Sequence, residues 1–82
     1  MNQIPIIQFK KMEDLLLRLG FQAAQQKENH VFYRHADGRT TTLPNNPWRD
    51  LARPLLLEIL REIQLTPEQL REELEKRASP RL

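Results

Sequence analysis

The spacing of apolar residues changes at Gly20, and this change divides the first half of the chain into a helix and a set of strands. Before this glycine, apolar side chains recur at helical spacing, at Phe9, Met12, Leu16 and Leu19. Gly20 stands where a helix is expected to end, because glycine takes a positive φ at little steric cost. The chain therefore predicts a helix over residues 8–19 and extended segments after it.

Three short segments after this glycine predict an antiparallel sheet. Residues 30–35 are rich in β-branched and aromatic types, which is typical of a strand. Residues 21–27 would suit a strand or a helix by propensity, and the preceding glycine and the following strand favour a strand. Asp37-Gly38 is a hairpin signal, so residues 39–43 are expected to form the third strand.

A second helix is expected to begin at Pro54, because proline fits the first helical turn, and to run to about Gln64. Its apolar face consists of Leu56, Ile59, Leu60 and Ile63.

A third, highly charged helix is expected over residues 66–77. Thr66 and Gln69 have the spacing of a capping box. Only Leu70 and Leu74 give this helix an apolar edge. We interpret it as a marginal tail, with a dimer or partner contact as the alternative.

The order of these elements predicts one α+β domain over residues 1–82, with a core over about 8–65. An α-β-β-β-α order suits a three-stranded antiparallel sheet with helices on one face, plus the short C-terminal helix. Double-stranded RNA-binding domains share this architecture, although architecture alone does not assign function. A chain of 82 residues buries a small core, so a partner or a homodimer would stabilise it.

The composition of the chain excludes several kinds of structure and site. The chain has no cysteine, which excludes disulfides and thiolate metal sites. We find neither a signal peptide nor an apolar stretch of bilayer length, so we expect a cytoplasmic protein without a membrane partner.

The positive charge is concentrated in the first part of the chain. Residues 1–53 hold eight Lys/Arg and five Asp/Glu, whereas residues 54–82 hold five Lys/Arg and six Asp/Glu. The basic first part favours a polyanionic partner, and an ordinary solvated surface is the alternative.

Two histidines are candidates for chemistry. Neither His30 nor His35 has the spacing of a metal site, so no metal and no cofactor are expected. A lone imidazole suits general acid–base catalysis on RNA, because RNA carries its own 2′-OH nucleophile. His30 at a strand edge is the better candidate, and a structural role is the alternative for both.

Basic side chains around His30 are candidate RNA contacts. Lys27, Arg34 and Arg39 are close to His30 in sequence or are expected to be close in space. Arg49 and Arg53 flank the loop into the second helix, where they could contact phosphates or be solvated. Trp48, in the same loop, is interpreted as a core or loop anchor rather than a base-stacking platform.

Five short motifs occur in order along the chain, at residues 19–21, 27–30, 35–39, 43–46 and 55–60. They read Leu-Gly-Phe, Lys-Glu-Asn-His, His-Ala-Asp-Gly-Arg, Leu-Pro-Asn-Asn and Leu-Leu-Leu-Glu-Ile-Leu. In this order and spacing, the chain resembles the HicA-type toxins of bacterial toxin–antitoxin pairs. Those toxins have Lys-Gly-Ser-His, His-Pro-Asp-Gly-Arg, Val-Pro-x-His and Thr-Leu-x-x-Ile-Leu at the last four places.

The resemblance implies a double-stranded RNA-binding-like fold and metal-independent cleavage of mRNA. It also implies a catalytic role for His30 and neutralisation by a HicB-type antitoxin. The chain departs from the family at Glu28, Asn29, Asn46 and Leu55. The alternative is therefore a weakened or inactive module of the same fold that binds RNA or the antitoxin without cleavage.

Overall fold

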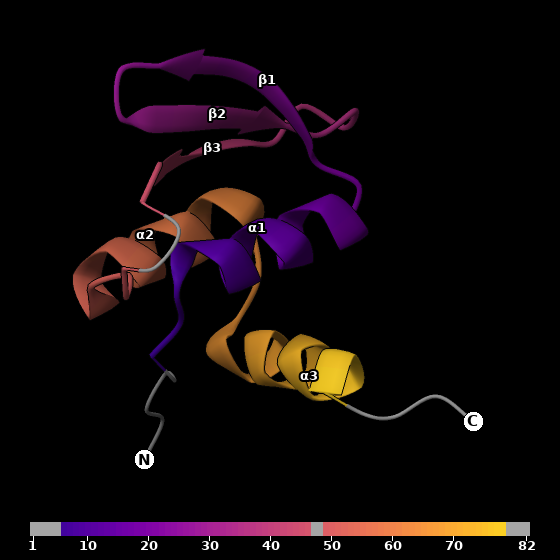
Figure 1. Ribbon diagram of the computed structural model, residues 1–82. Helices are drawn as coiled ribbons and strands as arrows, with labels where there is room; N and C mark the ends of the chain where they lie inside the picture. Colours follow the sequence, from indigo (N-terminus) through magenta and orange to yellow (C-terminus); the bar gives the residue numbers. More distant parts are fainter. Residues whose placement is uncertain (1–5, 47–48, 79–82) are drawn as a thin grey trace.

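A three-stranded antiparallel sheet forms one layer of the molecule, and helices form the rest (Figure 1). The computed structural model describes residues 6–46 and 49–78, so Trp48 lies outside the described residues. The elements are α1 (Phe9–Arg18), β1 (Gln22–Lys27), β2 (His30–Arg34), β3 (Thr40–Pro44), α2 (Arg53–Ile63) and α3 (Pro67–Ala78). Helices α1 and α2 cover one face of the sheet, and α3 lies on the side of these helices away from the sheet (Figure 1). This arrangement confirms the predicted α+β fold.

Helix α1 ends in a hydrogen-bonded turn at Gly20, as the sequence predicts. The N–H of Phe21 donates to the carbonyl of Leu16 at 2.9 Å, and the N–H of Gly20 donates to that of Leu17 at 3.1 Å. This pair of bonds is the Schellman motif, which needs a residue of positive φ. Gly20 supplies it with φ +104°. The motif turns the chain from α1 into β1.

Strand β2 occupies the centre of the sheet, with β1 and β3 on either side. Its buried residues Val31 and Tyr33 face the helices. Successive side chains of a strand point to opposite faces. His30, Phe32 and Arg34 therefore lie on the other face of the sheet, which no described helix covers (Figure 1).

The hydrophobic core lies between the sheet and the helices, and hydrogen bonds connect its polar groups. The predicted apolar face of α2 is confirmed, because its four residues are all buried. Tyr33 donates its hydroxyl to the Glu13 carboxylate at 2.7 Å, and Thr41 donates to Glu62 at 2.7 Å. Burial, together with the neighbouring Glu13 carboxylate, raises the pKa of the Tyr33 hydroxyl far above its ordinary value. Tyr33 therefore stays protonated as a donor inside the fold.

Helix α3 is part of the packed structure. The predicted capping box is confirmed, since the backbone N–H of Gln69 donates to the Thr66 hydroxyl at 3.0 Å and the N–H of Thr66 donates to the Gln69 side chain at 2.9 Å. Leu70 is fully buried in the core. Arg18 of α1 pairs with Glu73 of α3 at 2.8 Å. The interpretation of this helix as a marginal tail is therefore wrong.

Candidate functional site

Three of the predicted site residues lie on the face of the sheet that no described helix covers, which we call the open face. In the strand register, His30 lies opposite Lys27 of β1 and Pro44 of β3. Directly opposed residues of an antiparallel pair share a face of the sheet, with Cβ atoms about 4.5–5.5 Å apart. Arg34 occupies the same face at the far end of β2. The structure thus brings three predicted residues, Lys27, His30 and Arg34, onto one exposed surface.

A shallow hollow of about 310 Å³ lies beside the imidazole. It is lined by Gln25, Lys27, His30, Phe32 and Thr42. Within the described residues, neither Lys27 nor Arg34 forms an ion pair, and no hydrogen bond holds the His30 side chain. The strands that form this face contain no acidic residue. The hollow therefore combines an imidazole that has no hydrogen-bond partner among the described residues with the positive charge of Lys27. This combination suits an anionic ligand.

A second hollow, of about 280 Å³, lies between His30 and helix α2. Two carboxylates, those of Glu58 and Glu62, are among the residues that line it. The Thr41 hydroxyl holds Glu62 in place. Positive charge thus lies on the β1 side of His30 and negative charge on the α2 side. An anionic chain that reaches His30 would meet attraction over β1 and repulsion beside α2.

The turn that places His30 has an unusual backbone. Lys27 and His30 are paired in the register, so Glu28 and Asn29 form a two-residue loop. Glu28 has φ +55°, whereas Asn29 is not in the positive-φ region. A positive φ at the first loop position alone is the pattern in which glycine is preferred. Glycine would therefore suit this position better than Glu28, because it takes a positive φ at little steric cost.

Arg39 lies away from the open face, in a structural position. Its guanidinium pairs with Asp37 at 2.8 Å and donates to the Ile63 carbonyl at the end of α2. The same group lies 5.2 Å from the centre of the Phe21 ring. The N–H of Arg39 also donates to Asp37 Oδ1, and this hydrogen bond holds the pKa of the Asp37 carboxyl below its ordinary value. Arg39 thus joins the β2–β3 turn to α2.

The other two predicted arginines lie on the segment between the sheet and α2. The backbone carbonyl of Arg49 accepts the N–H of Phe9, which ties this segment to the start of α1. Arg53 is the first residue of α2, and its side chain is exposed. The structure does not bring either residue onto the open face of the sheet with His30.

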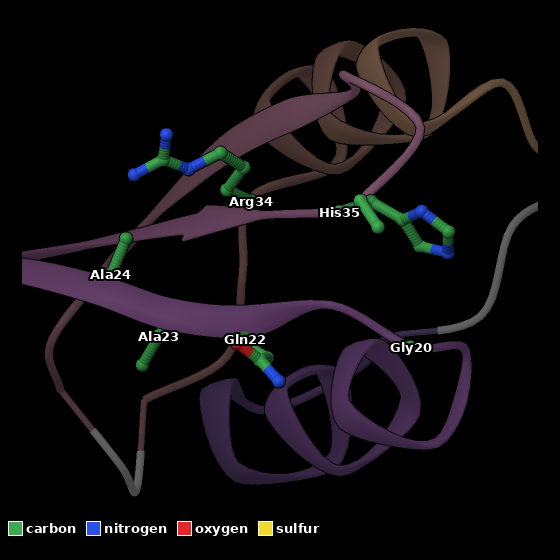
Figure 2. Close-up of a pocket in the computed structure, with 7 residues that line it drawn as sticks. Gly20, Gln22, Ala23, Ala24, Arg34 and His35 are labelled. Carbon is green, nitrogen blue, oxygen red and sulfur yellow. The ribbon is translucent and has the colours of Figure 1, made fainter.

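His35 is held in a structural position at the opposite end of β2. Its Nε2 lies 3.1 Å from the Leu19 carbonyl, and its Nδ1 accepts the N–H of Asp37 at 3.0 Å. The ring meets Phe21 edge-on, with centroids 5.0 Å apart. Figure 2 shows the hollow of about 400 Å³ at this end, where the side chains of Arg34 and His35 diverge. Since both ring nitrogens have partners, His35 fits a structural role better than a catalytic one.

Three residues that line the hollow beside His30 are not among those that the sequence predicts: Gln25, Phe32 and Thr42. The alternation of buried and exposed positions along β2 was the signal that could have found Phe32, because His30 and Phe32 are two residues apart. Gln25 and Thr42 lie opposite Phe32 in the register, and no sequence pattern reveals that register.

Two features are absent from the part of the chain that the structure describes. No group of three or more His, Cys, Asp or Glu side chains there could hold a metal ion. No helix within residues 6–46 and 49–78 has the length and apolar character needed to cross a membrane.

Comparison with known proteins places the chain in a family. No curated protein sequence matches it closely. A family model described as "HicA toxin of bacterial toxin-antitoxin" matches residues 9–65, from the start of α1 to just beyond α2. The match covers most of the chain and includes all three strands. The chain therefore belongs to the HicA toxin family of bacterial toxin–antitoxin systems.

Proposed function

We propose that this toxin is a metal-independent endoribonuclease that cleaves mRNA with His30 as general base. The observation that carries the proposal is the placement of His30 on an exposed, non-acidic sheet face, directly opposite Lys27. An imidazole titrates near neutral pH, so it can accept a proton there and release it again.

The reaction uses the nucleophile that RNA itself provides. His30 removes the proton from a 2′-OH group, and the 2′ oxygen attacks the adjacent phosphorus. The bond between phosphorus and O5′ breaks, which leaves a 2′,3′-cyclic phosphate and a 5′-hydroxyl end. The proton that O5′ needs comes from the protonated imidazole or from water. No electron transfer and no cofactor are required.

Lys27 and Arg34 stabilise charge in this scheme. Negative charge accumulates on the phosphorane oxygens in the transition state, and preorganised cations lower its free energy. Lys27 is the nearer cation, since it is the cross-strand partner of His30. Arg34 lies four residues along β2, so it would contact a neighbouring phosphate. Phosphate contacts by Arg49 and Arg53 stay predictions.

The partner of this toxin is an antitoxin, because the family functions in toxin–antitoxin pairs. We propose that it is of the HicB type and that it acts by covering the open face around His30. A homodimer, expected from the small size of the chain, stays a prediction.

A non-catalytic module that binds RNA or the antitoxin is the second candidate, and one observation favours it. Glu28 is an acidic residue in the turn, two residues before His30, on the approach that a substrate phosphate would take. Such a charge repels phosphate and slows cleavage. This alternative keeps the fold and the antitoxin contact and loses the reaction.

Cleavage by purified protein tests the proposal. The parent, His30→Ala and His35→Ala proteins are incubated with one mRNA, after circular dichroism confirms that each is folded. We expect His30→Ala to abolish cleavage and His35→Ala to keep much of it. Growth arrest on induction should follow the same order. Equal cleavage by the parent and His30→Ala would reject the assignment of His30, and no cleavage by the parent would favour the non-catalytic module.

A further inference from the structure

Phe32 is an aromatic side chain on the open face of the sheet, one outward position along β2 from His30. Its ring is partly exposed, although the other aromatic residues of this sheet and its α1 junction, Phe21 and Tyr33, are buried. Within the described residues, Phe21 makes ring contacts with His35 and Arg39, whereas Phe32 makes none. Part of the Phe32 ring thus lines the hollow beside His30 with no aromatic or cationic partner among the described residues.

The surroundings of Phe32 suit a nucleobase. Gln25 and Thr42 lie directly opposite it in the register, on β1 and β3. Both belong to the same hollow of about 310 Å³, and neither side chain has a hydrogen-bond partner among the described residues. An amide and a hydroxyl offer donors and acceptors to the edge of a base, while the ring offers a surface for its flat side.

We propose that Phe32 stacks on an unpaired base of the RNA, beside the nucleotide whose 2′-OH meets His30. This inference rests on the proposed function, because that function makes RNA the ligand. It adds to the function a residue, Phe32, that selects an unpaired segment of the RNA. Positive charge from Lys27 and Arg34 flanks Phe32 on the same face, which complements the RNA backbone. Sheet surfaces that combine cations with aromatic rings are a common way to bind single strands.

The base that stacks on Phe32 must be unpaired. In a duplex, the flat faces of the bases are already stacked on their neighbours, so no ring can reach them from a sheet. The carboxylates of Glu58 and Glu62 on the α2 side of His30 also disfavour the wide anionic surface of a duplex. The open face thus selects single-stranded RNA through Phe32, although the fold resembles that of double-stranded RNA-binding domains.

Binding of an RNA that cannot be cleaved tests this inference separately from catalysis. The probe is a mixed-sequence oligonucleotide with 2′-O-methyl groups, which has no 2′-OH proton for His30 to remove, used as a single strand and as the annealed duplex. We compare the parent with Phe32→Leu, which keeps the apolar character, and with Phe32→Tyr, which keeps the aromatic face. Thermal unfolding confirms that each variant is folded.

The expected results distinguish stacking from charge. Phe32→Leu should weaken single-strand binding by about fivefold to 150-fold, the range of one stacked base, and Phe32→Tyr should bind like the parent. The dependence of affinity on salt should be unchanged in Phe32→Leu. As a matched control on the same face, Lys27→Gln should reduce the slope of log affinity against log salt by about 0.7.

Three outcomes would overturn the inference. They are equal binding by the parent and Phe32→Leu, equal binding of duplex and single strand, and loss of antitoxin binding in Phe32→Leu without loss of RNA binding. The last would assign the face to a protein partner. Phe32-dependent binding in a protein that cleaves no RNA would leave this inference standing and reject the proposed nuclease function.

Discussion

The ring of His35 lies so close to Gly20 that a Cβ atom placed on Gly20 would be 2.9 Å from Nε2 of His35. The same Nε2 lies 3.1 Å from the carbonyl of Leu19, the residue just before this glycine. His35 therefore packs against the end of α1 through a space that only glycine leaves open. This contact connects the end of α1, just before β1, to the turn that follows β2. The whole β1–β2 hairpin lies between these two segments in the sequence.

Substitution of the two glycines should separate this contact from backbone strain. Gly20 and Gly38 have φ angles of +104° and +103°, but a Cβ on Gly38 would meet nothing within 4 Å. We expect Gly38→Ala to lower the free energy of unfolding by about 1–2 kcal/mol, the cost of a left-handed L-residue. Gly20→Ala should cost about 1–3 kcal/mol more, as overpacking does. Urea unfolding measures both.

The double variant Gly20→Ala/His35→Ala serves as the control, because it removes the ring that the new methyl group meets. Its loss of stability should be smaller than the sum of the two single losses. Strictly additive losses would show that the ring and the glycine do not interact.

The fold could be predicted because its elements carry strong local signals. The apolar spacing of α1 and α2, Gly20 at the end of α1 and the capping box of α3 each depend on a few neighbouring residues. The docking of α3 could not be predicted, because its sequence is mostly charged and one fully buried residue, Leu70, anchors it. The Arg18–Glu73 pair that supports it joins residues 55 positions apart. No local pattern contains such a contact.

The candidate site was predictable only in part, for a similar reason. His30, Lys27 and Arg34 share one strand pair, so the hairpin alone brings them together. Arg39 was expected beside them, but its partners are Asp37 and the carbonyl at the end of α2. An arginine two residues from an aspartate gives no sign in sequence of whether it turns toward a ligand or into the fold.

Acid should weaken the β2–β3 turn through Asp37. The hydrogen bond from the Arg39 N–H holds the pKa of Asp37 below its ordinary value in the folded protein. A lowered folded-state pKa contributes stability above the unfolded pKa, near 3.9, and this contribution is lost as the pH falls through the folded value. We therefore expect Asp37→Asn to be less stable than the parent at pH 7 and to approach it below about pH 4.

Urea unfolding of the two proteins at several pH values between 7 and 3 measures this difference. Carboxylates distant from residue 37 titrate equally in both proteins, so their effects cancel in the comparison. The imidazole of His35, whose Nδ1 lies 3.1 Å from Asp37 Oδ1, is removed by making the same comparison in a His35→Ala background. A gap in stability that stays constant down to pH 3 would contradict a charge-dependent role for Asp37.

Cleavage should not need a divalent cation. The proposed reaction takes its nucleophile from RNA and its base from His30, so none of its steps uses a metal ion. RNA digestion by the parent protein should proceed at the same rate with and without excess EDTA, and it should leave 2′,3′-cyclic or 3′-phosphate ends. Loss of activity on chelation that magnesium restores would reject the general-base mechanism.

Glu28 should have two separable effects: its charge slows cleavage, and its backbone conformation lowers the stability of the fold. Glu28 is the first residue of the two-residue turn that precedes His30, and its backbone has φ +55°. Two unit charges about 4 Å apart in water repel by about 1 kcal/mol, which corresponds to about a fivefold change in rate. Glu28→Gln removes the charge alone, whereas Glu28→Gly also relieves the positive φ, worth about 1–2 kcal/mol of stability.

Both variants should therefore cleave one RNA several-fold faster than the parent at low salt, while only Glu28→Gly should unfold at higher urea. The gain in rate should shrink at high salt, because ions screen charges separated by more than about 3 Å at 1 M ionic strength. A gain in neither variant at either salt concentration would mean that the carboxylate points away from the substrate. Slower cleavage by Glu28→Gln would mean that the carboxylate orients His30 and assists it. Rates measured side by side on a single RNA at two salt concentrations decide between repulsion and assistance.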